Sequence, residues 1–113
     1  MVDTGYVPDR GDLVWLDFNP QAGREQMGRR PAIVISPKNY NQRSHLALFC
    51  PVTSRIKGYP FEVPLQATEK ITGVVISDQV KSLDWTQRNV EFVEKADSKV
   101  FGEVIEKLSL LII

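Results

Sequence analysis

The stretch that decides the fold of this chain is Asp12-Leu13-Val14-Trp15-Leu16-Asp17-Phe18, which is followed by Asn19-Pro20. Most of its residues favour β-strands, and the Asn-Pro pair is typical of a turn, so we predict a strand closed by a turn. A second strand is predicted over Ala32-Ile33-Val34-Ile35-Ser36. The polar segment 21–30 between them is predicted to be an exposed loop.

Proline and glycine residues divide the first eighty residues into pieces that are too short for long helices. Short apolar segments predict further strands over residues 46–53, 61–65, 73–77 and 78–85, which together favour a small β-barrel. Ser36-Pro37 is expected to cap a short helix over residues 38–41.

The pattern changes near the end of the chain, where a helix is predicted over residues 97–108. Its apolar residues recur at helical spacing and form one face, which we expect to pack on the barrel. Asp97 and Ser98 are both candidate N-caps. The predicted fold class is therefore mainly β with a C-terminal α-helix. The apolar residues of the helical face are Val100, Phe101, Val104, Ile105 and Leu108.

The length of 113 residues and the composition, 42% hydrophobic and 25% charged, indicate one globular domain over residues 1–113. The single cysteine, Cys50, cannot form an intrachain disulfide, and no signal sequence is recognised, so we expect a cytoplasmic protein. No apolar run is long enough for a membrane span. No metal-ligand or phosphate-loop motif is present, so we expect neither a metal nor a cofactor.

The charges cancel in total but not along the sequence. The 14 Lys and Arg residues are balanced by 14 Asp and Glu residues. Between Pro20 and Pro60, however, seven basic residues accompany one acid, Glu25, which gives this window a net charge of +6 and the remainder −6. Loops can gather charge by chance, but the cluster also favours a polyanionic partner such as RNA. The basic residues are Arg24, Arg29, Arg30, Lys38, Arg43, Arg55 and Lys57.

Two junctions between strand and loop carry candidate catalytic side chains. Pro31 restricts Arg30 to an extended backbone, so its guanidinium can project from a rigid strand start and bind a phosphate. Thr53 ends another apolar strand. With Glu25 from the loop, these residues would supply a cation, a hydroxyl and a base for cleavage of an RNA phosphodiester. A surface salt bridge and turn capping are the alternative roles of Arg30 and Thr53.

The order of motifs closely resembles the MazF toxins of bacterial toxin–antitoxin systems, within the MazF/PemK/Kid superfamily. The resemblance runs from Tyr6 to Trp85 and also includes the terminal helix. The matching blocks are Tyr6-Val7-Pro8-Asp9-Arg10-Gly11-Asp12-Leu13-Val14-Trp15-Leu16-Asp17-Phe18, Gly23-Arg24-Glu25-Gln26-Met27-Gly28-Arg29-Arg30-Pro31-Ala32-Ile33-Val34-Ile35-Ser36, Pro51-Val52-Thr53-Ser54 with Lys57-Gly58-Tyr59-Pro60-Phe61-Glu62-Val63, and Asp78-Gln79-Val80-Lys81-Ser82-Leu83-Asp84-Trp85.

This resemblance implies an SH3-like barrel, a homodimer, and a sequence-specific, metal-independent endoribonuclease that cuts single-stranded RNA and so inhibits translation and growth. The expected products carry a 2′,3′-cyclic phosphate and a 5′-hydroxyl. The essential arginine, threonine and loop glutamate of the family fall on Arg30, Thr53 and Glu25. Ile76 stands where the Kid/PemK branch has a functional arginine, so the acid and base assigned in that branch cannot be carried over to this chain. Arg29 stands where a close relative has histidine, so a histidine general acid is also absent at that position.

The resemblance also implies a MazE-like antitoxin whose acidic tail would cover the same basic surface. The alternative function is that of CcdB toxins, which share the barrel but bind DNA gyrase without cutting RNA. A gyrase binder would not need the candidate catalytic residues. The RNA-binding candidates are Arg24, Gln26, Arg29, Ser54, Arg55, Lys57, Tyr59, Phe61, Asp78 and Gln79.

Three other features lead to expectations about packing. Cys50 is expected to be a buried apolar residue and not a nucleophile, because no neighbour in sequence would lower its pKa. His45 is expected in a loop or at a strand start. The apolar end of the chain, Leu108 to Ile113, is too hydrophobic to remain exposed, so it should pack on the barrel or on a partner subunit.

Overall fold

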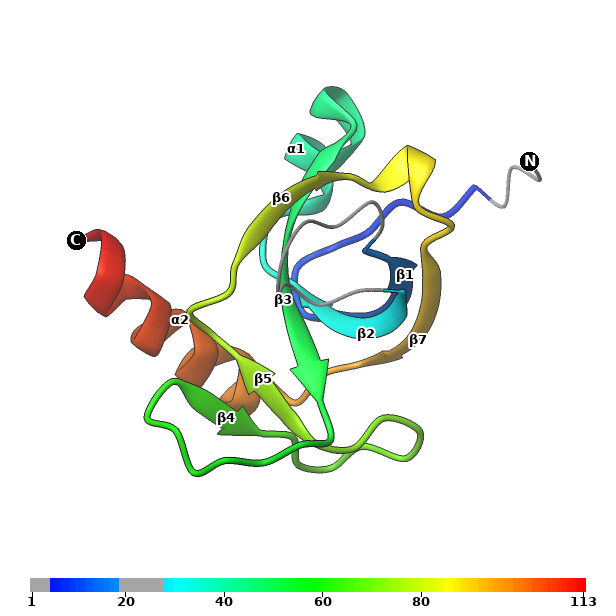
Figure 1. Cartoon of the computed structure of the whole chain (residues 1–113). Helices are drawn as coiled ribbons and strands as arrows, with labels where there is room; N and C mark the ends of the chain where they lie inside the picture. Colours follow the sequence, from blue (N-terminus) through cyan, green and yellow to red (C-terminus); the bar gives the residue numbers. More distant parts are fainter. Residues whose placement is uncertain (1–4, 19–27) are drawn as a thin grey trace.

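The structure of the chain, a computed structural model, describes residues 5–18 and 28–113. The predicted class, mainly β with a C-terminal α-helix, is confirmed (Figure 1). The elements in chain order are β1 (Asp12–Asp17), β2 (Arg29–Val34), α1 (Lys38–Ser44), β3 (Leu46–Thr53), β4 (Glu62–Pro64), β5 (Val74–Ile76), β6 (Lys81–Asp84), the short 3₁₀ helix η1 (Trp85–Gln87), β7 (Glu91–Lys95) and α2 (Ser98–Ile112).

The strands form one strongly curved antiparallel sheet in the order β4-β5-β3-β2-β1-β7, and β6 also pairs with β3. The two halves of β3 have different partners, because residues 46–49 pair with β6 and residues 52–53 with β5. In Figure 1, β1, β2, β3, β6 and β7 form a ring. No ladder joins β7 to β4 or β6 within the described ranges, so hydrogen bonds do not close the barrel.

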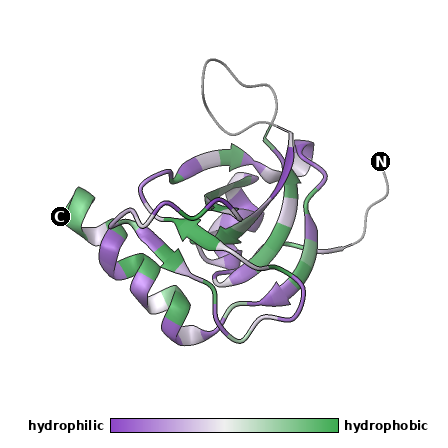
Figure 2. Cartoon of the chain, turned by 60° about the horizontal axis from the view of Figure 1, so that its bottom comes forward, coloured by the Kyte–Doolittle hydropathy of each residue, from purple (hydrophilic) through white to green (hydrophobic). Residues whose placement is uncertain are grey.

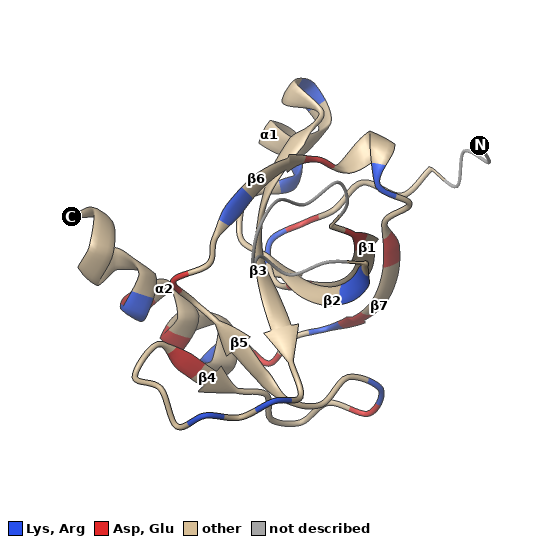
Figure 3. Cartoon of the chain, viewed as in Figure 1, with Lys and Arg blue, Asp and Glu red and all other residues tan. Residues whose placement is uncertain are grey.

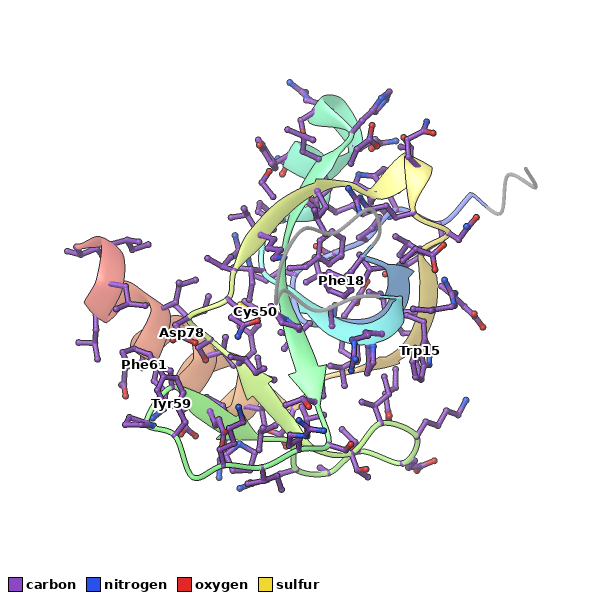
Figure 4. The ribbon with its side chains drawn as sticks, in the orientation of Figure 1. Trp15, Phe18, Cys50, Tyr59, Phe61 and Asp78 are labelled. Atoms are coloured by element: carbon purple, nitrogen blue, oxygen red, sulfur yellow. The ribbon has the colours of Figure 1, made fainter. Side chains whose placement is uncertain are left out.

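Alternating residues of the central strands form two hydrophobic cores, one on each face of the sheet. Figure 4 shows Phe18 inside the ring of strands and Trp15 outside it. The inner core contains Val14, Leu16, Phe18, Ala32, Val34, Ala47 and Phe49. The helix core contains Leu13, Ile33, Ile35, Cys50, Val52, Val63, Ile71 and Val75, together with Val100, Val104 and Leu108 of α2.

The terminal helix has the predicted buried face and begins at the predicted residue. The Asp97 side chain is the N-cap and accepts a hydrogen bond from the backbone N–H of Lys99 at 2.8 Å. The helix continues to Ile112, beyond the predicted end at Leu108. Leu108 is buried, whereas Leu110 to Ile113 remain exposed at the end of the chain (Figure 2). The barrel of this chain therefore does not cover its apolar end.

Strand β2 differs from the prediction because it begins at Arg29 instead of Ala32. Its first residues, which were expected in the loop, pair with β1 in the register Asp17↔Arg29 and Leu16↔Arg30. Proline lacks a backbone N–H, but Pro31 is accommodated in this ladder opposite Trp15. The strand therefore includes the arginine that was expected at its edge.

The short helix α1 is longer than predicted, and its start differs in detail. Pro37 occupies the N-cap position, and no side chain caps the helix. The expected capping by Ser36 is wrong, because its hydroxyl donates a hydrogen bond to Oδ1 of the buried Asn41 at 2.6 Å.

Two further elements were not predicted separately. The segment after Asp84 forms η1 because Asp84 accepts from the Thr86 N–H, and β7 adds a strand beside β1.

Candidate functional site

The structure brings Arg30 and Thr53 to adjacent strands on the same face of the sheet. Strands β2 and β3 are paired from Val34↔Phe49 to Ala32↔Pro51. Both strands continue beyond the last of these pairs, and the same register places Arg30 opposite Thr53. Arg30 alternates with inner-core residues of β2 and pairs with Leu16, so it lies on the inner face.

Thr53 reaches this face at the end of β3, where its hydroxyl helps to shape the following turn. Its Oγ1 accepts a hydrogen bond from the Arg55 backbone N–H at 3.1 Å, as the turn-capping interpretation predicts. An oxygen that accepts in this way still has its own proton to donate. The Thr53 hydroxyl can therefore shape the turn and bind a phosphate oxygen.

Gly73 fixes the backbone of Thr53 from the neighbouring strand. A Cβ atom at position 73 would lie 2.2 Å from the carbonyl oxygen of Thr53, and Gly73 has a positive φ of 123°. Only glycine permits this close approach without displacing the end of β3. Gly73 was not predicted as a functional residue, although an isolated glycine at the start of a strand is a signal for close backbone contact.

Arg29 lies on the opposite face of β2 from Arg30, because neighbouring residues of a strand alternate. Its guanidinium donates to Asp17 Oδ1 at 3.3 Å, to the Asn89 carbonyl oxygen at 2.8 Å and to Glu91 Oε1 at 3.1 Å. A hydrogen bond from the Asn89 side chain, together with Arg29, lowers the pKa of Asp17. The structure thus separates the two adjacent arginines, and Arg29 joins β1, β2 and β7.

A second group of predicted residues gathers beside α2, as Figure 4 shows for Tyr59, Phe61 and Asp78. The rings of Tyr59 and Phe61 lie 5.9 Å apart, and the Tyr59 hydroxyl donates to Asp78 Oδ2 at 2.7 Å. This hydrogen bond raises the pKa of Tyr59. Phe61 is partly buried, whereas Tyr59 is half exposed. These three residues form one unit, which we call the tyrosine cluster.

The loop that carries Tyr59 is held by charged side chains from two elements. The Glu62 carboxylate accepts hydrogen bonds from the backbone N–H groups of Lys57, Gly58 and Tyr59, at 3.0 to 3.3 Å. Lys107 of α2 donates to the carbonyl oxygen of Pro60 at 2.6 Å. Glu62 and Lys107 were not predicted from the sequence, because only the folded chain brings them to this loop.

The other RNA-binding candidates fall into two sets. Ser54, Arg55, Lys57 and Gln79 are exposed in the connections after β3 and β5. The basic residues between β3 and β4 are visible as blue segments of that loop (Figure 3). Arg24 and Gln26 lie outside the described residues, and so does the catalytic candidate Glu25.

Cys50 and His45 have the structural positions that the sequence predicts. Cys50 is completely buried in the helix core, and burial raises the pKa of its thiol to about 12, so it is not a nucleophile near neutral pH. His45 ends α1 in a left-handed conformation and immediately precedes β3.

Within the described part of the chain, no three His, Cys, Asp or Glu side chains could share a metal ion. In the same residues, neither α-helix has the length and apolarity of a membrane span.

Comparison with known proteins identifies the family. Residues 9–112 match the model of the PemK-like, MazF-like toxin of type II toxin–antitoxin systems. The chain belongs to this toxin family. It is 53% identical over 83 residues to the endoribonuclease toxin MazF of Escherichia coli K12, covering 74% of each chain. It is also 34% identical over 111 residues to the E. coli endoribonuclease toxin ChpB, covering 92% of this chain and 93% of that one.

Solved structures of similar proteins agree with this assignment. A crystal structure of MazF from Deinococcus radiodurans matches with a TM-score of 0.91 and 56% identity, over 96% of this chain and 99% of that chain. A MazE–MazF complex from the same organism matches with a TM-score of 0.84 and 50% identity, over 96% and 98% of the two chains. The predicted toxin class and endoribonuclease activity are confirmed, and the CcdB-like alternative is not favoured.

Proposed function

We propose that the inner face at Arg30 and Thr53 cleaves single-stranded RNA without a metal ion, at short recognition sequences, and thereby inhibits translation and growth. The observation that carries this proposal is the register of β2 and β3, which are paired as far as Ala32↔Pro51; extending this register by two residues places Arg30 opposite Thr53. A fixed guanidinium and a hydroxyl on one face can bind the nonbridging oxygens of one phosphodiester.

The proposed reaction uses the 2′-hydroxyl of the RNA as the nucleophile. Glu25 accepts the proton of that hydroxyl while its oxygen forms a bond to phosphorus. Arg30 stabilises the charge that develops on the phosphorane, and Thr53 orients the phosphate. The bond from phosphorus to the 5′-oxygen then breaks, and a proton is delivered to the leaving oxygen. The products are a 2′,3′-cyclic phosphate and a 5′-hydroxyl.

The assignment of the base follows from the ordinary properties of the side chains. Arginine has a pKa above about 12 and is a poor base, whereas a carboxylate can accept a proton at neutral pH. Arg30 could still supply the proton to the leaving 5′-oxygen. We therefore assign Glu25 as the general base and Arg30 as the main electrostatic group.

We also propose that the toxin acts in the cytoplasm as a homodimer and is inhibited by a MazE-like antitoxin. The similar Deinococcus toxin forms a MazE–MazF complex, which supports an antitoxin of the same kind here. An acidic tail would fit the cations around the inner face. The exposed apolar end of α2, in which Leu110 is 73% exposed, supports a second subunit because such a surface is unfavourable in water.

The test is to map the cleavage ends on a long RNA of mixed sequence in the presence of EDTA. We expect a few preferred sites and ends that carry a 2′,3′-cyclic phosphate. Arg30→Ala and Glu25→Ala should each lower the cleavage rate by about 10²–10³-fold. Near-normal rates for both folded variants would overturn the catalytic assignment, and a complete dependence on metal would overturn the proposed chemistry.

A further inference from the structure

We propose that Lys81 is an additional phosphate-binding residue of the RNA-cleavage face. This inference rests on the proposed function and extends it to a phosphate other than the scissile one. Lys81 begins β6, where it is partly buried, and it was not among the candidates selected from the sequence.

The register places Lys81 on the inner face. Strand β6 pairs with β3 in the register Phe49↔Lys81 and Ala47↔Leu83. Phe49 and Ala47 belong to the inner core, and Leu83 packs against it. Directly opposed residues of paired strands lie on the same face, as do residues two apart in one strand. Lys81 therefore shares the inner face with Arg30 and Thr53.

The acidic side chains of the neighbouring strands lie away from Thr53 or already bind other protein groups. Asp17 and Glu91 bind Arg29 on the outer face. Asp84 is three residues from Lys81 on β6, so its side chain lies on the opposite face of the strand. Its carboxylate accepts hydrogen bonds from the backbone N–H and the hydroxyl of Thr86. The charged side chains that the described strands place on this face toward Thr53 are therefore the cations Arg30 and Lys81.

The remaining strand acids are also accounted for by contacts away from Thr53. Asp12 lies at the opposite end of β1, where Tyr6 and Lys95 donate to it. Glu94 accepts from the backbone of residues 69–71, and Glu62 from residues 57–59. Asp78, in the turn before β6, accepts from Tyr59 through Oδ2, and its Oδ1 is buried. Charge on the inner face thus favours an anionic ligand that extends from Arg30 to Lys81.

The spacing of the two cations indicates which phosphate Lys81 binds. Arg30 is opposite Thr53 and Lys81 is opposite Phe49, so their positions differ by four residues along β3. At about 3.3 Å per residue this offset is about 13 Å along the strands, and because β2 and β6 lie on either side of β3, two strand spacings of about 4.8 Å bring the separation of the two backbone positions to about 16 Å. Two side chains at this separation fit different phosphates of one strand better than a single phosphate. We assign Lys81 to a phosphate of the same RNA strand other than the one that Arg30 binds.

The test measures binding of a short RNA that has 2′-deoxyribose at its mapped cleavage position, so that it cannot be cut. Lys81→Gln and Lys81→Ala should each weaken binding by about tenfold at low salt. Each should also reduce the slope of log K against log salt by about 0.7, the value for one phosphate contact on a single strand. Lys81→Arg should retain both quantities. Lys99→Ala, at an exposed position of α2, is the matched control and should leave both unchanged.

Replacing single phosphates with neutral methylphosphonates locates the contact. One substitution at a phosphate other than the scissile one should weaken binding to the wild-type chain but have little further effect on Lys81→Gln, because both changes remove the same interaction. Salt-dependent binding that is the same for wild type and Lys81→Gln would overturn the assignment of Lys81 alone. Weaker binding with an unchanged salt slope would also overturn it, because this indicates a structural role. If the wild type does not bind the RNA, the proposed function fails as well.

Discussion

A Cβ atom on Gly73 would lie 2.2 Å from the Thr53 carbonyl oxygen, so the end of β3 can reach its position only beside a glycine. The contact connects the start of β5 with the strand that carries the candidate catalytic hydroxyl. Because the register of β2 and β3, extended beyond Ala32↔Pro51, places Thr53 opposite Arg30, Gly73 also helps to set the relative positions of the two candidate catalytic side chains.

Gly73→Ala should therefore affect both stability and cleavage. The added methyl group forces β3 and β5 apart, and the positive φ of position 73 disfavours alanine, so we expect the free energy of unfolding to fall by about 2 kcal/mol or more. Urea unfolding and RNA cleavage, measured at a concentration where the variant is folded, test this. Gly102→Ala in α2 is the control, because a Cβ atom at position 102 would have no neighbour within 4 Å, and it should be stabilising by about 0.5–1 kcal/mol. An unchanged cleavage rate in folded Gly73→Ala would disprove the positioning role.

Thr53 provides a more direct test of the site, because its hydroxyl can be removed with little change in volume. Thr53→Val should lower the cleavage rate by about 10²-fold, since it removes a donor to the phosphate, and Thr53→Ser should remain within a few fold of the wild type. Single-turnover cleavage of a short RNA measures the effect on chemistry. Both variants keep a small side chain at the end of β3, so similar rates for valine and serine would show that the hydroxyl does not act in the reaction.

The sequence predicted the strands and the buried helix face well, because periodicity and turn residues act locally. The inner core residues Val14 and Leu16 and the helix residue Leu108 all lie in segments that were predicted correctly. The contact between Gly73 and Thr53 depends on which strands become neighbours, and local patterns do not determine this. Lys81 was missed for the same reason, since its face is set by pairing with Phe49.

The pair Arg29 and Arg30 shows a different limit of prediction from sequence. Both arginines were expected near RNA because they lie together in a basic segment. The structure extends β2 over both residues, and alternation sends their side chains to opposite faces. The boundary of a strand thus decides which of two adjacent cations shares a face with Thr53, and strand boundaries depend on tertiary pairing with β1.

Glu94 predicts a specific pH dependence of stability. The backbone N–H of Glu69, together with those of Lys70 and Ile71, lowers the pKa of Glu94 below its value in an unfolded chain. A lowered pKa in the folded state stabilises the protein above the unfolded pKa of about 4.3, and this contribution is lost as the pH falls through the folded value.

Glu94→Gln should consequently be less stable than the wild type at pH 7, and the difference should shrink as the pH is lowered below about 4. Urea unfolding of both proteins between pH 7 and pH 3 measures this difference. Glu103→Gln, at an exposed position of α2, should show no comparable change. A difference between wild type and Glu94→Gln that stays constant with pH would contradict the role of the Glu94 carboxylate.

The tyrosine cluster allows the two contributions of one side chain to RNA binding to be separated. Tyr59→Phe keeps the half-exposed ring but removes the hydrogen bond to Asp78, so the loop between β3 and β4 is held less firmly. We expect a rise in KM of a few fold with little change in kcat. Tyr59→Ala also removes the ring, and the loss of base stacking should raise KM by about tenfold or more. Lys107→Ala, which frees the Pro60 carbonyl from α2, should resemble Tyr59→Phe, and Lys107→Arg should restore binding. Equal KM values for Tyr59→Ala and the wild type would exclude this loop from RNA binding, whereas a change confined to kcat would place Tyr59 in the chemical step.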